Sequence, residues 1–115
     1  MGESYLTGTE FRDSGTKQIL LRTAIEDLRG QRWQVTLKND EITVLVEAEL
    51  TVLAVIEREN RIETGHLTLD DVYFELVNDA GVKIFFPLVQ FKGIEKYSRS
   101  RNFRFDSYWW MFQAL

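Results

Sequence analysis

Residues 72–86 read VYFELVNDAGVKIFF, and this stretch decides the fold. Hydrophobic residues alternate on both sides of Asn78-Asp79-Ala80-Gly81, four residues that favour a turn. The pattern predicts a β-hairpin that joins Val72–Val77 to Val82–Phe86. Because side chains alternate between the two faces of a strand, we expect two hydrophobic sets to meet in the core. These sets are Val72, Phe74 and Leu76 on the first strand and Val82, Ile84 and Phe86 on the second.

A second alternating stretch lies upstream, between Arg32 and Val46. Asn39-Asp40 is predicted to be a two-residue turn within it, because both residue types tolerate positive φ. The two flanking strands are predicted to share one inward face. Its members are Trp33, Val35 and Leu37 before the turn and Ile42, Val44 and Val46 after it.

The segment between these hairpins is less regular. Thr51–Ile56 is apolar on both faces and rich in β-branched residues, which favours a central strand. A short buried helix through Glu47–Leu50 is the alternative. The polar remainder is predicted as a solvated turn over 57–61, a strand over 62–69 with a bulge at Gly65, and a turn at Asp70-Asp71.

Near the N-terminus, Thr16–Arg29 is the best helix candidate. Its apolar stripe is formed by Leu21, Ala24, Ile25 and Leu28, and Gly30 stands where a left-handed residue ends a helix. A strand remains a competitor because Ile19, Leu21, Thr23 and Ile25 also alternate. Residues 1–15 are predicted to be a flexible polar arm, in which 10–12 add to a sheet edge.

After Pro87, which cannot donate a hydrogen bond to a sheet ladder, the sequence predicts a strand over 89–97 that is interrupted at Gly93. Ser98–Asn102 is basic and polar, as expected of a loop. Two structures compete for the aromatic end of the chain. A short helix over 106–115 would be capped by Asp106 or Ser107, whereas a final strand would point Phe103, Phe105 and Trp109 inward.

Together these segments predict an α+β fold that is mainly antiparallel β. We expect a curved sheet or small barrel of about six to eight strands, with one helix near the N-terminus and the C-terminal helix as an option. Residues 16–115 are expected to form a single globular domain, because 115 residues suit one hydrophobic core.

Composition narrows the classes of function. The chain has no cysteine, which excludes disulfides, thiolate metal sites and cysteine nucleophiles. It has neither a long apolar run nor a signal-like N-terminus, so we expect a cytoplasmic protein. The net charge is −4, with −7 over residues 1–91 and +3 over residues 92–115. A basic tail therefore follows an acidic body.

Signals for catalysis are weak. His66 is the only histidine, and the sequence contains neither a G-x-S-x-G elbow nor a phosphate- or dinucleotide-binding glycine motif. Turn carboxylates could ligate a hard cation, but they fit no known loop; they are Glu57, Glu59, Glu63, Asp70 and Asp71. We expect no catalytic residue, metal or cofactor, and keep a carboxylate-based metal-dependent enzyme as a second alternative.

The basic tail supports a nucleic-acid or nucleotide binder as the first alternative. Basic side chains neutralise phosphates, and aromatic rings stack on bases. The candidate residues for this function are Lys92, Lys96, Tyr97, Arg99 and Arg101.

The leading hypothesis is a non-enzymatic module that binds a protein partner or a second copy of itself. Consecutive Tyr108, Trp109 and Trp110 cannot all face one core, so at least one large ring should be exposed. Exposed aromatic rings and arginines are typical of binding hot spots. The predicted partner surface consists of Tyr108, Trp109, Trp110, Arg101 and Arg104.

Overall fold

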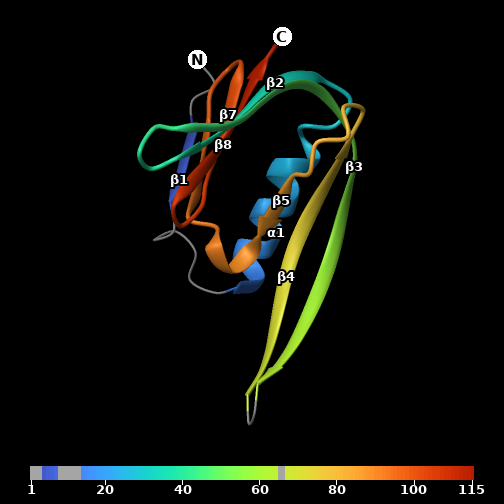
Figure 1. Ribbon diagram of the computed structural model, residues 1–115, viewed down its shortest axis with the longest axis vertical. Helices are drawn as coiled ribbons and strands as arrows, with labels where there is room; N and C mark the ends of the chain where they lie inside the picture. Colours follow the sequence, from blue (N-terminus) through green and yellow to red (C-terminus); the bar gives the residue numbers. More distant parts are fainter. Residues whose placement is uncertain (1–3, 8–13, 65–66) are drawn as a thin grey trace.

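A curved antiparallel sheet surrounds one helix in the computed structural model, which describes residues 4–7, 14–64 and 67–115 (Figure 1). The described strands follow the order β1-β6-β7-β8-β2-β3-β4-β5, and the sheet is not closed into a barrel. The predicted fold class is therefore confirmed. The elements are β1 (Ser4–Thr7), α1 (Ser14–Glu26), β2 (Arg32–Asn39), β3 (Val44–Thr64), β4 (Leu67–Asn78), β5 (Phe85–Pro87), the 3-10 helix η2 (Leu88–Gln90), β6 (Gly93–Lys96), β7 (Ser100–Arg104) and β8 (Tyr108–Ala114).

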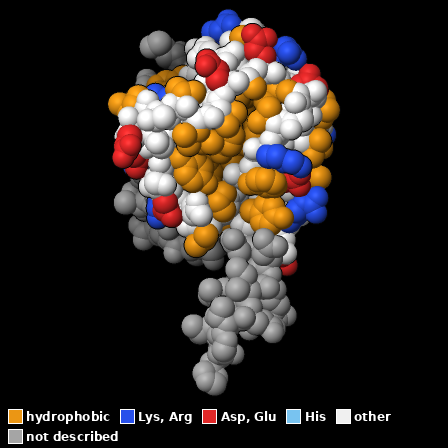
Figure 2. Space-filling view, in the orientation of Figure 1, with side chains coloured by type: hydrophobic (Ala, Val, Ile, Leu, Met, Phe, Trp, Pro, Cys, Tyr) orange, Lys and Arg blue, Asp and Glu red, His pale blue; other side chains and the backbone are white. Residues whose placement is uncertain are grey.

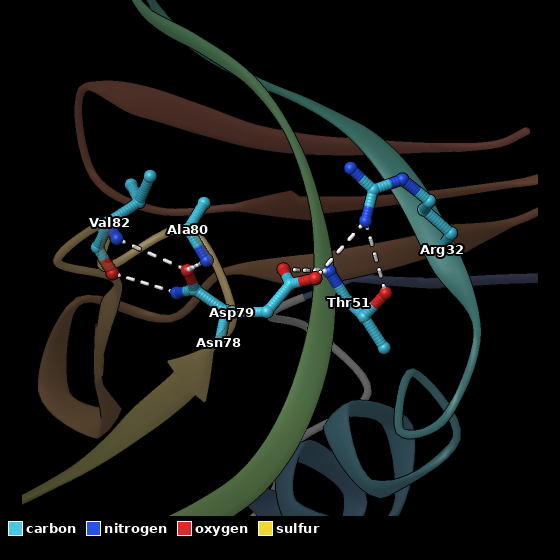
Figure 3. A network of polar contacts seen from close by, with 6 residues as sticks. All are labelled: Arg32, Thr51, Asn78, Asp79, Ala80 and Val82. Carbon is cyan, nitrogen blue, oxygen red and sulfur yellow. Dashed lines mark hydrogen bonds and ion pairs between the residues drawn. The ribbon is translucent and has the colours of Figure 1, made fainter.

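The predicted hairpin forms, with Phe74 paired with Phe86 across β4 and β5, but its second strand begins at Phe85 rather than Val82. Its loop is organised by Asn78, which is 9% exposed. The Asn78 Oδ1 accepts hydrogen bonds from the backbone N–H groups of Ala80 and Val82, both at 3.1 Å (Figure 3). Its Nδ2 donates to the carbonyls of Val82 at 2.8 Å and Leu76 at 3.3 Å. Gly81 supplies the positive φ of 69° that the turn needs.

Asn78→Ala is expected to lower the free energy of unfolding by about 2 kcal/mol, because it leaves several partly buried backbone groups without partners. Urea denaturation measures the loss. Lys83→Ala is the matched control in the same hairpin, since Lys83 is exposed and the change should cost less than about 0.5 kcal/mol. Equal losses in the two variants would contradict a structural role for the Asn78 network.

The next residue ties this loop to β3 and β2. The Asp79 carboxylate accepts a hydrogen bond from the Thr51 backbone N–H at 2.8 Å and pairs with the Arg32 guanidinium at 3.1 Å (Figure 3). These donors, the Thr51 N–H first, hold the pKa of Asp79 below its ordinary value. The loop is thus fixed to the middle of the sheet.

Helix α1 lies inside the curve of the sheet (Figure 1). Leu21, Ile25 and Leu28 are fully buried against the strands, and Ala24 is partly buried beside them. Gly30 has a φ of 80°, and its N–H donates to the Val52 carbonyl at 3.0 Å. A helix is therefore confirmed here and the competing strand is wrong, although the helix ends at Glu26 rather than Arg29.

Strand β2 also follows prediction, with Trp33 and Val35 buried and Leu37 packed against the core. The turn after it differs from the expected two-residue turn. Asp40–Thr43 separate β2 from β3, and the residue with positive φ is Ile42 at 62°. The Asn39 side chain organises this turn by accepting a hydrogen bond from the Thr43 N–H at 2.9 Å.

Two predicted turns and one alternative helix are wrong, because β3 runs unbroken through 47–50 and 57–61 and β4 runs through Asp70-Asp71. These strands pair antiparallel as far as Thr64 with Leu67, where the expected bulge at Gly65 falls outside the described residues. The pair projects as a ribbon beyond α1 (Figure 1). A ribbon without a covering layer has no need of a continuous apolar face, so its polar composition resembles that of a turn.

The C-terminal region is entirely extended. Residues 108–114 form β8, so the alternative helix over 106–115 is wrong and a final strand is present. The expected orientation is wrong for Trp109, which points outward, and Phe103 lies on the separate strand β7. The expected strand over 89–97 is shorter: η2 and a loop precede β6. The expected loop over 98–102 is only a tight turn, in which the Tyr97 N–H donates to the Ser100 carbonyl at 2.9 Å before β7 begins.

The sheet edge at the N-terminus is formed by β1, which pairs with β6. An edge contribution from the N-terminal arm was expected, but from residues 10–12, which lie outside the described residues. None of the helices within the described ranges combines the length and hydrophobicity that crossing a membrane requires.

Candidate functional site

The strand β8 separates its aromatic rings onto two faces of the sheet. Trp110 and Phe112 are buried in the core, while Trp109 and Met111 point the other way and are only partly buried. The Arg104 guanidinium lies over the Trp109 ring, 5.0 Å from its centroid. Lys38 of β2 pairs with Trp109 on the opposite side. One large ring therefore remains accessible, between two cations.

The other two rings of the predicted partner surface face inward. Trp110 is 4% exposed and lies 6.4 Å from the Phe86 ring. Tyr108 stacks on Phe105 at 5.1 Å, and its hydroxyl donates to the Gln90 Oε1 at 3.0 Å. Burial raises the pKa of Tyr108, with a further contribution from Asp106. Of the three rings, only Trp109 lies on the outward side of the sheet.

Strand register places Trp109 at one corner of a wider surface, which we call the outer face. It consists of the outward side chains of four neighbouring strands. These are Ser100, Asn102 and Arg104 on β7, Gln113, Met111 and Trp109 on β8, Gln34, Thr36 and Lys38 on β2, and Glu49 and Glu47 on β3.

A shallow groove of about 310 Å³ crosses the outer face, lined by residues of β2, β7 and β8 that include Thr36, Asn102 and Met111. Charges are confined to its ends. Arg104 and Lys38 flank Trp109, and exposed Glu47 and Glu49 stand at the opposite side on β3. Among the described residues, neither carboxylate contacts a basic side chain. Arg104 also lies 3.9 Å from the Asp40 carboxylate. The outer face thus has two cations and one partly compensating carboxylate at one corner, a neutral centre, and two carboxylates at the other corner.

Arg101 does not belong to this surface. It lies on the inner face, where its guanidinium is 5.9 Å from the centroid of the buried Trp33 ring. Its Nη1 donates to the carbonyls of Tyr97 and Ser100. Arg101 and Arg104, which were expected to line one rim, therefore occupy opposite sides of the sheet.

The remaining candidates for nucleic-acid binding are engaged by nearby oxygens. The Lys92 Nζ lies 3.1 Å from Asp106, and the Lys96 Nζ lies 3.8 Å from Asp27. Arg99 donates to a main-chain carbonyl near the C-terminus at 3.3 Å, and the Tyr97 hydroxyl donates to Glu95 at 3.2 Å. The basic side chains are therefore dispersed rather than gathered on one face.

Of the candidate carboxylates, Glu57 is also engaged by neighbouring side chains. Glu57 faces α1, where its Oε1 accepts hydrogen bonds from Arg22 and from the Gln18 Nε2 at 2.8 Å. Arg22 and then Gln18 lower the pKa of Glu57. Across the described residues, no three acidic or histidine side chains converge as metal ligands. His66 lies outside the described residues, and the side chains of Glu63, Asp70 and Asp71 are likewise not described.

Hydrophobic atoms gather over the middle of the globular body in the view of Figure 2, while charged side chains lie mainly towards its margin. An open sheet cannot cover its core on every side, so several apolar side chains next to the core stay partly exposed. They are Ala24, Leu37, Val55, Val72, Val82, Tyr108 and Ala114.

Sequence reasoning missed the residues that complete the outer face: Lys38, Met111, Glu47 and Glu49. The outward orientation of Lys38 could be predicted from the sequence, because it alternates with the inward residues Val35 and Leu37. Their proximity could not be predicted, since β2 pairs with β8, which lies far away in the sequence.

A scan against family models, a search of curated proteins and a search of solved structures each found no match.

Proposed function

We propose that the protein is a non-enzymatic binding module that acts through protein–protein contact, and that its partner is a second copy of itself. The observation that carries the proposal is the partly exposed Trp109 ring, held under Arg104 on the outward side of an interior strand. Tryptophan and arginine are the residue types most enriched among hot spots, and they bring large contact area. Outward positions of a purely structural sheet do not need an indole ring.

The charge pattern of the outer face favours a second copy over an unrelated partner. A two-fold axis through the neutral centre, near Met111 and Thr36, would bring the basic corner of one copy onto the acidic corner of the other. Arg104 of each copy would then face Glu49 of the other, giving two equivalent ion pairs. A surface that is complementary to itself in this way needs no second protein to balance its charges.

Trp109→Ser is expected to weaken self-association by about thirtyfold or more, because truncating a hot-spot residue costs about 2 kcal/mol or more. Light scattering coupled to size-exclusion chromatography measures the mass. Val89→Ser is the matched control: Val89 is 67% exposed but lies on η2, away from the outer face. Loss of the dimer in Val89→Ser but not in Trp109→Ser would contradict the proposal and show that the two copies meet through another surface.

The same chromatography distinguishes the nucleic-acid alternative. If nucleic acid co-purifies with the chain, and nuclease removes both it and the added mass, the protein proposal fails. The dispersed basic side chains support the opposite result, because counterion release requires several cations along one backbone path.

A further inference from the structure

A second cavity lies on the inner side of the sheet, between α1 and the ends of β6 and β7. Its volume is about 180 Å³. Helix α1 contributes Leu20, Thr23 and Ala24 to its wall, Asp27 follows directly after the helix, and the strands contribute Ile94, Lys96 and Arg101. For comparison, a dry cavity of about 150 Å³ admits benzene. The cavity is therefore large enough for a small organic molecule.

Arg101 lines this cavity. Its Nε is shielded from solvent and has no hydrogen-bond partner among the described residues. Its Nη1 is occupied by the Tyr97 and Ser100 carbonyls. A buried donor without an acceptor is costly. The Nε and Nη2 groups form one fork of the guanidinium, which matches the two oxygens of a carboxylate.

The charges and the apolar wall specify the ligand further. Lys96 is 3.8 Å from Asp27, so this pair is close to neutral. No described carboxylate pairs with Arg101, which leaves one net positive charge. Leu20, Ala24 and Ile94 supply apolar surface. A doubly charged anion such as phosphate would lack a second free cation, whereas one carboxylate on a short apolar body meets both features.

We propose that this cavity binds a small apolar monocarboxylate, with the carboxylate at the Arg101 guanidinium and the hydrocarbon body against α1. The residues involved lie on the opposite side of the sheet from the outer face. The proposal is therefore independent of self-association.

Isothermal titration with hexanoate tests the proposal, and hexanamide serves as its neutral counterpart. One hexanoate is expected to bind each chain, with roughly tenfold or greater weakening for hexanamide and for Arg101→Gln, since a hydrogen bond to a charged group is lost. Arg99→Gln is the matched control, because Arg99 is a nearby arginine outside the cavity that contacts a main-chain carbonyl.

Ala24→Leu provides a variant that keeps Arg101 and fills the cavity from the helix side, so it should abolish hexanoate binding. This variant and the comparison with hexanamide test carboxylate binding in the cavity even if Arg101→Gln does not fold. The absence of saturable hexanoate binding to the wild-type chain overturns the proposal. So does hexanamide binding of equal strength, or a loss in Arg99→Gln as large as in Arg101→Gln.

Discussion

Phe86→Ala is expected to lower the free energy of unfolding by about 3–5 kcal/mol, the usual cost of removing a fully buried phenylalanine. The Phe86 side chain is 0% exposed and stands at the centre of the aromatic core. Its ring lies 4.8 Å from Phe103, 5.2 Å from Phe105 and 6.3 Å from Phe112. Removing it would leave a cavity bordered by β7, β8 and the turn that joins them.

The adjacent residue offers a matched control. Phe85 is 41% exposed and contacts the Tyr73 ring edge-on at 5.8 Å, so Phe85→Ala should cost only about 1 kcal/mol. Urea denaturation of both variants at one fixed protein concentration gives the comparison, because association would make stability depend on concentration. Similar losses in the two variants would mean that the hairpin does not pack as described.

Charge reversal is expected to have the largest effect on self-association. Arg104→Glu alone and Glu49→Arg alone should each weaken the dimer by roughly a hundredfold, since the two-fold axis places each like-charge contact in the interface twice. The double variant, in which both charges are exchanged, should restore association. Sedimentation velocity measures all four proteins, and circular dichroism checks that each one folds.

The pairing of these two residues is what the double variant examines. If it associates no better than the single variants, Arg104 and Glu49 do not meet across a two-fold axis. Added salt supplies a further check, because screening should weaken the wild-type dimer. A dimer that is indifferent to both salt and charge reversal would require an apolar contact elsewhere.

The alternation of apolar and polar residues was enough to predict those parts of the fold in which residues close in sequence are also close in space. The hairpin of 72–86 and the inward face of Trp33 and Val35 follow from alternation and turn chemistry. The β3–β4 ribbon was missed for a physical reason. Beyond the core, the part of the pair that spans residues 57–71 lacks the apolar alternation by which strands are recognised.

The candidate surfaces depend on long-range pairing, which alternation does not specify. Nothing local places Lys38 beside Trp109. The inward orientation of Arg101 could have been predicted from the sequence. Arg101 has the same strand phase as Phe103, which is buried, and Lys96 has the same phase as Ile94. A basic residue that shares its strand phase with core residues is expected to point inward. The cavity beside Arg101 could not be predicted in this way, because it also depends on where α1 packs.

The mass of the wild-type chain in solution tests most directly whether the outer face joins two copies. Sedimentation equilibrium of nuclease-treated protein, repeated over a range of concentrations, is the suitable measurement. We expect the mass to rise with concentration towards twice the 13.5 kDa of one chain. A mass of 13.5 kDa at every concentration would contradict self-association through Trp109 and its neighbours.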